Sequence, residues 1–439
     1  MTAEIAVLNK MAIALAADSA VTIERLKGQK IYNTANKLFA LSKFHPIGIM
    51  FYGNAEFMGI PWESLIKIYR TKIGNQKFDT LAHYADNFIK FLKTTPLFPQ
   101  KEQEKYLIYI VRSYFHFIKT SIDENINQEI ESKTEIDENK VKKVVSETIK
   151  NHRIRLNGLN DLAGIKKNQS KKLAIKYKTL TRKIIKDVFQ ELPLINSSLN
   201  DLTWIMGFLF TKDIFPAAVS GVVIAGFGEC DTFPSIKSFS IETKIDNKLK
   251  YKEENWEQIS FSNSAAIIPF AQSEMVSTFM EGIDPNLKQI YETYLKKLFS
   301  EYPDYVIENI NQLNDSEKKG MKKKLSVVGD KVLEDLKKKI RNNIFETHII
   351  PIISAVSVLP KDELAAMAEA LVNLTSFKRK VSMDAETVGG PIDVAVISKG
   401  DGFVWIKRKH YFKSDINPQF FLKYFLDTKS EDKNEEKYC

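Results

Sequence analysis

Strand-forming segments lie near both ends of this 439-residue chain, and long charged helical segments separate them. The strand-like segments are apolar or alternating and are bounded by turn residues. They cover residues 3–17, 30–41, 46–52, 216–226, 235–243, 392–397 and 403–409. Strands from both ends of a chain bury their apolar faces by joining common sheets. The pattern therefore predicts one α+β sandwich whose sheets combine N- and C-terminal strands.

Two charged helical blocks interrupt this sandwich, at residues 61–200 and 285–347. In the first block, residues 102–119 carry Tyr106, Ile110, Tyr114 and Ile118 at every fourth position, which is typical of an amphipathic helix. We expect shorter helices at residues 272–282 and 360–377. The predicted domains are a sandwich of residues 1–60, 201–284 and 348–427, two helical insertions at 61–200 and 285–347, and a flexible tail at 428–439.

Composition favours an intracellular globular protein. Hydrophobic residues make up 44% of the chain, and the net charge of +9 is modest for this length, so nucleic-acid binding has little support. The two cysteines, Cys230 and Cys439, form no disulfide framework, and we find no signal peptide and no apolar run long enough to span a membrane. We expect a cytoplasmic protein without membrane association.

The histidines give no indication of a metal site. The six of them are scattered along the chain without the spacing that ligands of one ion require. We expect neither a metal nor another cofactor.

Thr2 follows the initiator methionine directly and opens the first strand-like segment. Methionine is readily removed before small residues, which would leave Thr2 with a free α-amine. That amine titrates near neutrality, with a pKa of ~7.7–8.0, so an N-terminal threonine carries its own general base. The simpler interpretation is that Thr2 serves N-terminal processing alone.

Three further positions stand at strand ends. Asp18 ends the first apolar segment, either as an ordinary turn residue or as a carboxylate held against a partner charge. Lys37 opens a strand, where lysines are usually solvated. Gly53 ends the next strand and is suited to presenting its backbone N–H to a ligand.

The order of Thr2, Asp18, Lys37 and Gly53 resembles that in the proteasome-type N-terminal-nucleophile (Ntn) hydrolases. The local sequence is most similar to that of the bacterial homologues in this family. The spacing from Thr2 to Asp18 is that of the family. The chain end is also similar: a helix, Asp384, the Gly389-Gly390 pair, a strand and a Gly-Asp-Gly turn. Residues 222–226 and 235–241 resemble the central strands of the family, and residues 267–282 the helix that follows them.

The resemblance implies a four-layer α-β-β-α Ntn sandwich and a threonine peptidase or amidohydrolase. Thr2 Oγ would attack an amide carbonyl while the α-amine takes its proton. Lys37 would lower the pKa of the nucleophile, Asp18 would hold Lys37, and the Gly53 N–H would stabilise the oxyanion. Asp384 would support the amine.

Two parts of the family pattern differ here. Asp384 lies one residue farther from the glycine pair than in the family, so Glu386 and Thr387 compete for its role. Ser273 stands where the family has a Ser-Gly-rich segment.

The partners implied are a peptide or amide substrate and further copies of the chain, although insertions of this size could block ring assembly or dock another protein. The alternative is a catalytically inactive homologue that keeps the sandwich as a scaffold or partner-binding protein. The long charged helices and the missing Ser-Gly segment favour that alternative.

Overall fold

A computed structural model describes residues 3–25, 28–131, 137–166, 168–216, 219–310, 314–382, 388–410, 412–419 and 422. Within them the chain is mixed α+β, and its paired strands are antiparallel, in agreement with the predicted class.

The first sheet joins strands from both ends of the chain. Its order is β12-β1-β2-β13-β14. The strands are β1 (Ala3–Asn9), β2 (Ala12–Ala17), β12 (Ala265–Ala271), β13 (Asp393–Ser398) and β14 (Gly402–Lys407). β1 and β2 are buried along their whole length because the next strands cover their edges and other layers cover their faces.

The second sheet has the order β11-β10-β9-β6-β5. Its strands are β5 (Leu38–Ala40), β6 (Ile47–Gly53), β9 (Ser220–Gly226), β10 (Ser235–Ile245) and β11 (Lys248–Gln258). Two small hairpins lie outside both sheets: β3 (Val21–Arg25) with β4 (Gly28–Tyr32), and β7 (Glu56–Phe57) with β8 (Ile60–Pro61). The predicted strand at 30–41 is therefore divided between β4 and β5.

The two sheets face each other through an apolar core that includes Leu8, Leu15, Met50 and Val223. Helices cover the outer face of each sheet. The first sheet packs against α8 (Glu274–Glu281), α11 (Ile350–Val358) and α12 (Lys361–Val381). The second packs against α1 (Trp62–Ile73) and α2 (Leu81–Thr94).

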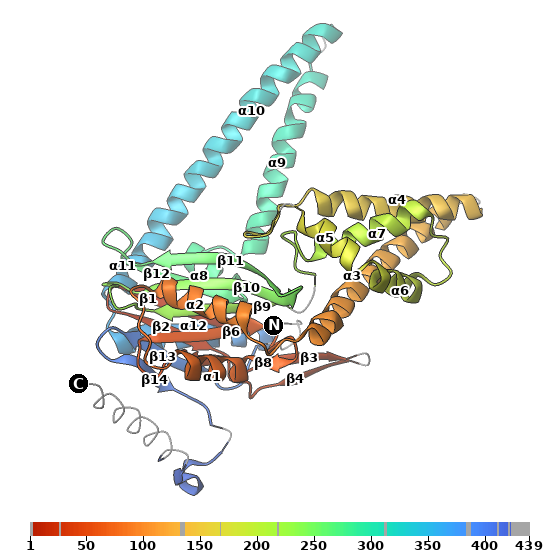
Figure 1. Cartoon of the computed structure of the whole chain (residues 1–439). Helices are drawn as coiled ribbons and strands as arrows, with labels where there is room; N and C mark the ends of the chain where they lie inside the picture. Colours follow the sequence, from red (N-terminus) through yellow and green to blue (C-terminus); the bar gives the residue numbers. More distant parts are fainter. Residues whose placement is uncertain are drawn as a thin grey trace.

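Helices α3 to α7 form a lobe beside the sheets (Figure 1). They are α3 (Gln100–Glu131), α4 (Glu138–Asn157), α5 (Gln169–Lys176), α6 (Lys178–Phe189) and α7 (Asn196–Leu209). The lobe has an apolar core of its own, in which Ile110, Tyr114 and Ile118 of the predicted stripe are buried. Residues 61–200 thus pack as two groups, because α1 and α2 share the core of the second sheet.

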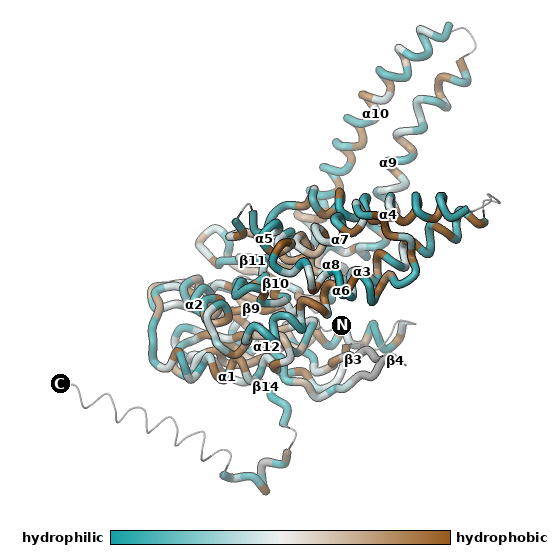
Figure 2. Tube along the Cα trace, turned by 45° about the vertical axis from the view of Figure 1, so that its right-hand side comes forward, coloured by the Kyte–Doolittle hydropathy of each residue, from teal (hydrophilic) through white to brown (hydrophobic). Residues whose placement is uncertain are grey.

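Helices α9 (Pro285–Glu308) and α10 (Asp315–Ile344) form a hairpin that projects from the body (Figures 1 and 2). Local sequence fixes their starts: Asp284 caps α9 ahead of Pro285, and Asn314 forms a reciprocal capping box with Glu317 at α10. A π-helical turn, η1 (Phe345–Ile349), joins α10 to α11, and a short 3-10 turn, η2 (Ser414–Ile416), lies near the end of the described chain.

The helix predicted from the residues at 272–282 is present as α8, whereas the longer helix at 267–282 that the family resemblance implies does not form. Residues up to Ala271 form β12, and α8 starts at Glu274 and ends at Gly282, whose φ of 71° suits a C-terminal glycine. Pro269 is tolerated in β12 because β12 lies at the edge of its sheet. Among the described helices, none combines the length and the apolar character that crossing a bilayer requires.

Candidate active site

Asp18 follows β2 directly and is held by hydrogen bonds to both carboxylate oxygens. Oδ1 accepts from the Ala3 amide at 3.2 Å, and Oδ2 accepts from the Ala20 amide at 3.2 Å and the Gly389 amide at 3.0 Å. The side chain is 1% exposed. A buried carboxylate with this many donors is fixed in position.

Lys37 completes the environment of Asp18. Its Nζ lies 2.6 Å from Asp18 Oδ1, and the lysine is also 1% exposed. This settles two choices that the sequence leaves open: Asp18 is held against a partner charge, and Lys37 is not a solvated strand lysine. A buried ammonium beside one carboxylate can act on a third group placed next to the pair, by its charge or by donating a hydrogen bond.

Gly53 ends β6, which pairs with β5, and Lys37 directly precedes β5. The Phe51 amide donates to the Lys37 carbonyl at 3.0 Å, and Gly53 is two residues farther along β6, about 6.6 Å from Phe51. Gly53 is exposed and has a φ of 78°. A Cβ at this position would lie 2.6 Å from the Val219 carbonyl oxygen, so only glycine fits there without strain.

The Gly389-Gly390 segment closes the Asp18 environment from the C-terminal side. Besides the Gly389 donation to Asp18, the Ser19 amide donates to the Gly389 carbonyl at 3.1 Å, and Ser19 Oγ donates to the Pro391 carbonyl. Gly390 has a φ of 78°, and a Cβ there would come within 2.7 Å of the Asn33 carbonyl oxygen. Segments from the start, the first hairpins and the end of the chain therefore meet at Asp18.

The first residue that the structure describes, Ala3, lies at this meeting point. The Asp18 amide donates to the Ala3 carbonyl at 3.1 Å, and β12 pairs Ala271 with Ala3 on the other side. Ala271 has a φ of 63°, a conformation that costs a non-glycine residue roughly 1–3 kcal/mol. Ser273, two residues on, is exposed at the start of α8. Thr2, Asp384, Glu386 and Thr387 lie outside the described residues.

Glu4 and Tyr52 were not singled out from the sequence. Glu4 is fully buried on β1, and Tyr52 precedes Gly53 on β6. Burial, together with the negative charges of Glu4 and Glu254, raises the pKa of Tyr52 from 10.0 to about 12. The sequence signal for this position was the carboxylate of Glu4 among the apolar residues of β1 that surround it, from Ala3 to Leu8.

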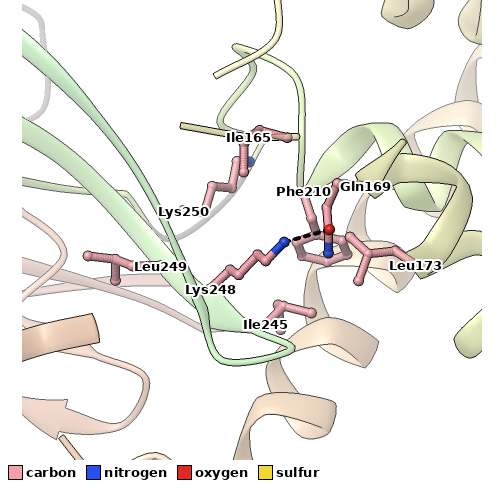
Figure 3. A pocket seen from close by; sticks show the side chains of 8 residues that line it. All are labelled: Ile165, Gln169, Leu173, Phe210, Ile245, Lys248, Leu249 and Lys250. Atoms are coloured by element: carbon pink, nitrogen blue, oxygen red, sulfur yellow. Dashed lines mark hydrogen bonds between the residues drawn. The ribbon is translucent and has the colours of Figure 1, made fainter. Parts of the chain in front are cut away.

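A second polar region lies where the lobe meets the second sheet (Figure 3). Lys250 Nζ is 2.5 Å from Glu242 Oε2 in a buried ion pair, and Lys248 Nζ is 2.5 Å from Gln169 Oε1. Burial lowers the pKa of Lys250, and the adjacent Glu242 carboxylate opposes that shift. The cavity here has about 10 Å³, enough for roughly one water molecule, so it does not accommodate a substrate. It is lined by Ile165, Gln169, Leu173, Phe210, Ile245, Lys248, Leu249 and Lys250.

The chain matches no protein-family model and no curated protein. The described residues hold no cluster of three or more His, Cys, Asp or Glu side chains suited to a metal ion.

Proposed function

We propose that this chain is a proteasome-like N-terminal threonine hydrolase that cleaves peptide or other amide bonds. The observation that carries the proposal is the buried Asp18–Lys37 pair beside the Ala3 amide, which is bonded to residue 2. We assign the nucleophile to Thr2, the residue bonded to the Ala3 nitrogen, in a chain that has lost Met1. A buried ammonium at this position is suited to activating a nucleophile, whereas a lysine that only contributes surface charge would be solvated.

The helix–sheet–sheet–helix packing supports the same proposal. The family resemblance implies a four-layer α-β-β-α sandwich, and helices pack on the outer face of each of the two sheets here. Here β1 lies between β12 and β2, and the even-numbered Ala6 and Leu8 pack into the core between the sheets.

In the proposed reaction, Thr2 Oγ attacks the substrate carbonyl carbon while its proton passes to the Thr2 α-amine. Lys37, held by Asp18, stabilises the developing negative charge on Oγ, and the Gly53 amide stabilises the oxyanion, a contribution of roughly 2.7–4 kcal/mol in known cases. The C–N bond then breaks, the leaving amine takes the proton, and an ester to Thr2 remains. Water, deprotonated by the same α-amine, hydrolyses that ester and restores the hydroxyl.

The test combines intact-mass measurement with covalent labelling. Removal of Met1 should be visible as the loss of one methionine from the purified protein. A threonine-directed epoxyketone, which reacts with both a free α-amine and its hydroxyl, should add once, and peptide mapping should place it at Thr2. The Thr2→Ala variant should lose the adduct, Thr2→Ser should keep it, and Thr293→Ala, on the exposed face of α9, should behave like the unaltered protein.

Retention of Met1, or peptide hydrolysis that survives Thr2→Ala, would refute the catalytic proposal. In that case the same sandwich serves as an inactive scaffold. The projecting hairpin favours this second candidate, since it offers a surface for binding that catalysis does not require (Figure 1).

A further inference from the structure

The α9–α10 hairpin has little support from the rest of the molecule. Its two helices pack along each other, and at their base they contact α8 and η1 (Figures 1 and 2). Two helices alone bury only one side of each, and isolated helices draw most of their stability from tertiary packing. The residues that point away from the shared seam therefore indicate whether a further surface packs against the hairpin.

The seam between the two helices is defined by buried residues on each. Pro303 and Ile307 are buried on α9, and Gly329 and Leu333 on α10. At the middle of the seam, a Cβ on Gly329 would lie 3.5 Å from the Phe299 carbonyl oxygen. Glycine thus lets the two helices approach closely at this level.

A second apolar stripe runs beside the seam on both helices. On α9 it contains Ile290, Tyr294, Leu298 and Tyr302, and on α10 it contains Val328 and Val332. Each of these residues immediately precedes either a residue that faces the seam or a residue that lies a multiple of four positions from a seam residue. For example, Leu298 precedes Phe299, and Val328 precedes Gly329. The stripe is well exposed: Ile290 is 66%, Tyr294 65% and Val328 58% accessible.

The two halves of this stripe lie on the same side of the hairpin. A step of one residue turns about 100° around a helix, so both halves are offset from the seam in the same sense. A two-fold axis perpendicular to the plane of two antiparallel helices exchanges the two helices. A side chain that points to one side of that plane still points to the same side after the rotation. Equal offsets from the seam therefore give one continuous two-helix face, which we call the hairpin face.

We propose that the hairpin face binds the hairpin face of a second copy of this chain, forming an intermolecular four-helix bundle. The inference is independent of the catalytic proposal. A second copy supplies a partner with the same length, the same helix pairing and the same apolar stripe, as an isologous interface requires. Aromatic and branched aliphatic side chains, here four residues apart on each helix, are also the kind that packs in helix-bundle cores.

The size of the hairpin face agrees with what a stable dimer needs. The 24 residues of α9 span about 36 Å, and two helices side by side are roughly 20 Å wide, so each copy offers about 700 Å². Specific interfaces bury about 800 Å² per partner, with totals from about 1,200 Å² upward.

Two neighbouring valines provide a matched test. Val328 lies on the hairpin face, whereas Val327, 63% exposed, lies a further 100° around α10 and away from it. Mass measurement by light scattering, over a range of concentrations of the full chain, should show a dimer for the unaltered protein and for Val327→Lys. Val328→Lys should weaken dimerisation by about 100-fold or more, because each copy then buries an unpaired charge. Tyr294→Lys should have the same effect from α9, and circular dichroism should show that all variants stay folded.

Each outcome decides the question. A monomer at every concentration would overturn the proposal, and so would a dimer that Val327→Lys and Val328→Lys affect equally, since another surface would then hold it. The proposal would also be overturned if a different protein co-purified on the hairpin face while the chain itself was monomeric. That protein, and not a second copy, would then be the partner.

Discussion

Single residues at Asp18 show how burial and charge combine in this protein. Burial removes water from the Asp18 carboxylate, and four protein donors replace that water: three backbone amides and one ammonium. Lys37 depends on Asp18 far more than Asp18 depends on Lys37, since the three amides remain if the lysine is removed. The pair is therefore unequal, and its two members are expected to respond differently to substitution.

Asp18→Ala should destabilise the protein more than Lys37→Met. The alanine removes the carboxylate that pairs with the buried Lys37 ammonium, and breaking a buried pair in this way typically costs about 3–5 kcal/mol. In Lys37→Met, Asp18 still accepts from Ala3, Ala20 and Gly389. Urea unfolding of both variants measures the order. Equal losses, or a larger loss for Lys37→Met, would mean that the amides do not hold Asp18 as described.

Tyr52 gives a pH dependence that can be worked out in sign. Its pKa is about 12 in the folded protein and 10.0 ordinarily, so between pH 10 and 12 the unfolded chain releases a proton that the folded chain keeps. The unfolded state then binds fewer protons, and stability falls as pH rises through this window. One pKa unit corresponds to about 1.4 kcal/mol, which sets the scale of the loss near pH 11.

The Tyr52→Phe variant isolates this contribution. Relative to Tyr52→Phe, the unaltered protein should lose unfolding free energy between pH 9 and 11, whereas the difference between the two should be constant from pH 7 to 9. Glu4→Gln should reduce the effect, because the Glu4 charge contributes to the raised pKa of Tyr52. A difference that does not change with pH would show that Tyr52 ionises normally.

At the scale of elements, the β6–β9 pairing depends on a small residue opposite a large one. Tyr52 pairs with Gly221, and a Cβ on Gly221 would lie 1.9 Å from Tyr52 Cζ. The ring therefore occupies the space that the missing side chain leaves on β9. It also contacts Phe270 across the two sheets, with ring centroids 6.0 Å apart.

Gly221→Ala should cost about 1–3 kcal/mol by overpacking against the Tyr52 ring. In a Tyr52→Ala background the same substitution should cost much less, because the obstructing ring is gone. Thermal or urea unfolding of the four proteins gives the coupling energy between the two positions. Additive effects would indicate that strand conformation alone, and not the ring, requires glycine at position 221.

The elements that the sequence predicts are those with local apolar patterns. β6 and β9 are apolar runs bounded by turn residues and form where expected, whereas the single strand-like segment predicted at 3–17 forms two strands, β1 and β2. β11 was not predicted because its sequence is largely charged; it is an edge strand whose position is fixed by pairing with β10.

The same distinction applies to the site. Asp18 and Lys37 could be singled out from strand ends and from family resemblance. The Gly389 amide that also holds Asp18 lies 371 residues away, and nothing local indicates that contact.

The described part of the chain consists of a two-sheet body, a helical lobe with its own core, and a hairpin that buries only a few residues along its seam (Figure 1). The lobe is tied to the second sheet by the hydrogen bond from Lys248 of β11 to Gln169 of α5 and by Ile245, which packs into the core of the lobe. The hairpin has no comparable attachment beyond its base. Its removal should therefore be far less disruptive than removal of the lobe.

The two ends of the hairpin are close together, which makes that removal feasible. A Cβ on Gly282 would lie 2.7 Å from the His348 ring, so the chain leaves the body and returns to it at one point. Replacing residues 286–344 by a short Gly/Ser linker should keep the body folded, with a cooperative thermal transition within a few degrees of the unaltered protein. Epoxyketone labelling at Thr2 should persist, because the Asp18–Lys37 pair is held by elements of the body, and the shortened chain should be monomeric. Loss of labelling in a folded, shortened chain would instead show that the hairpin contributes to the active site.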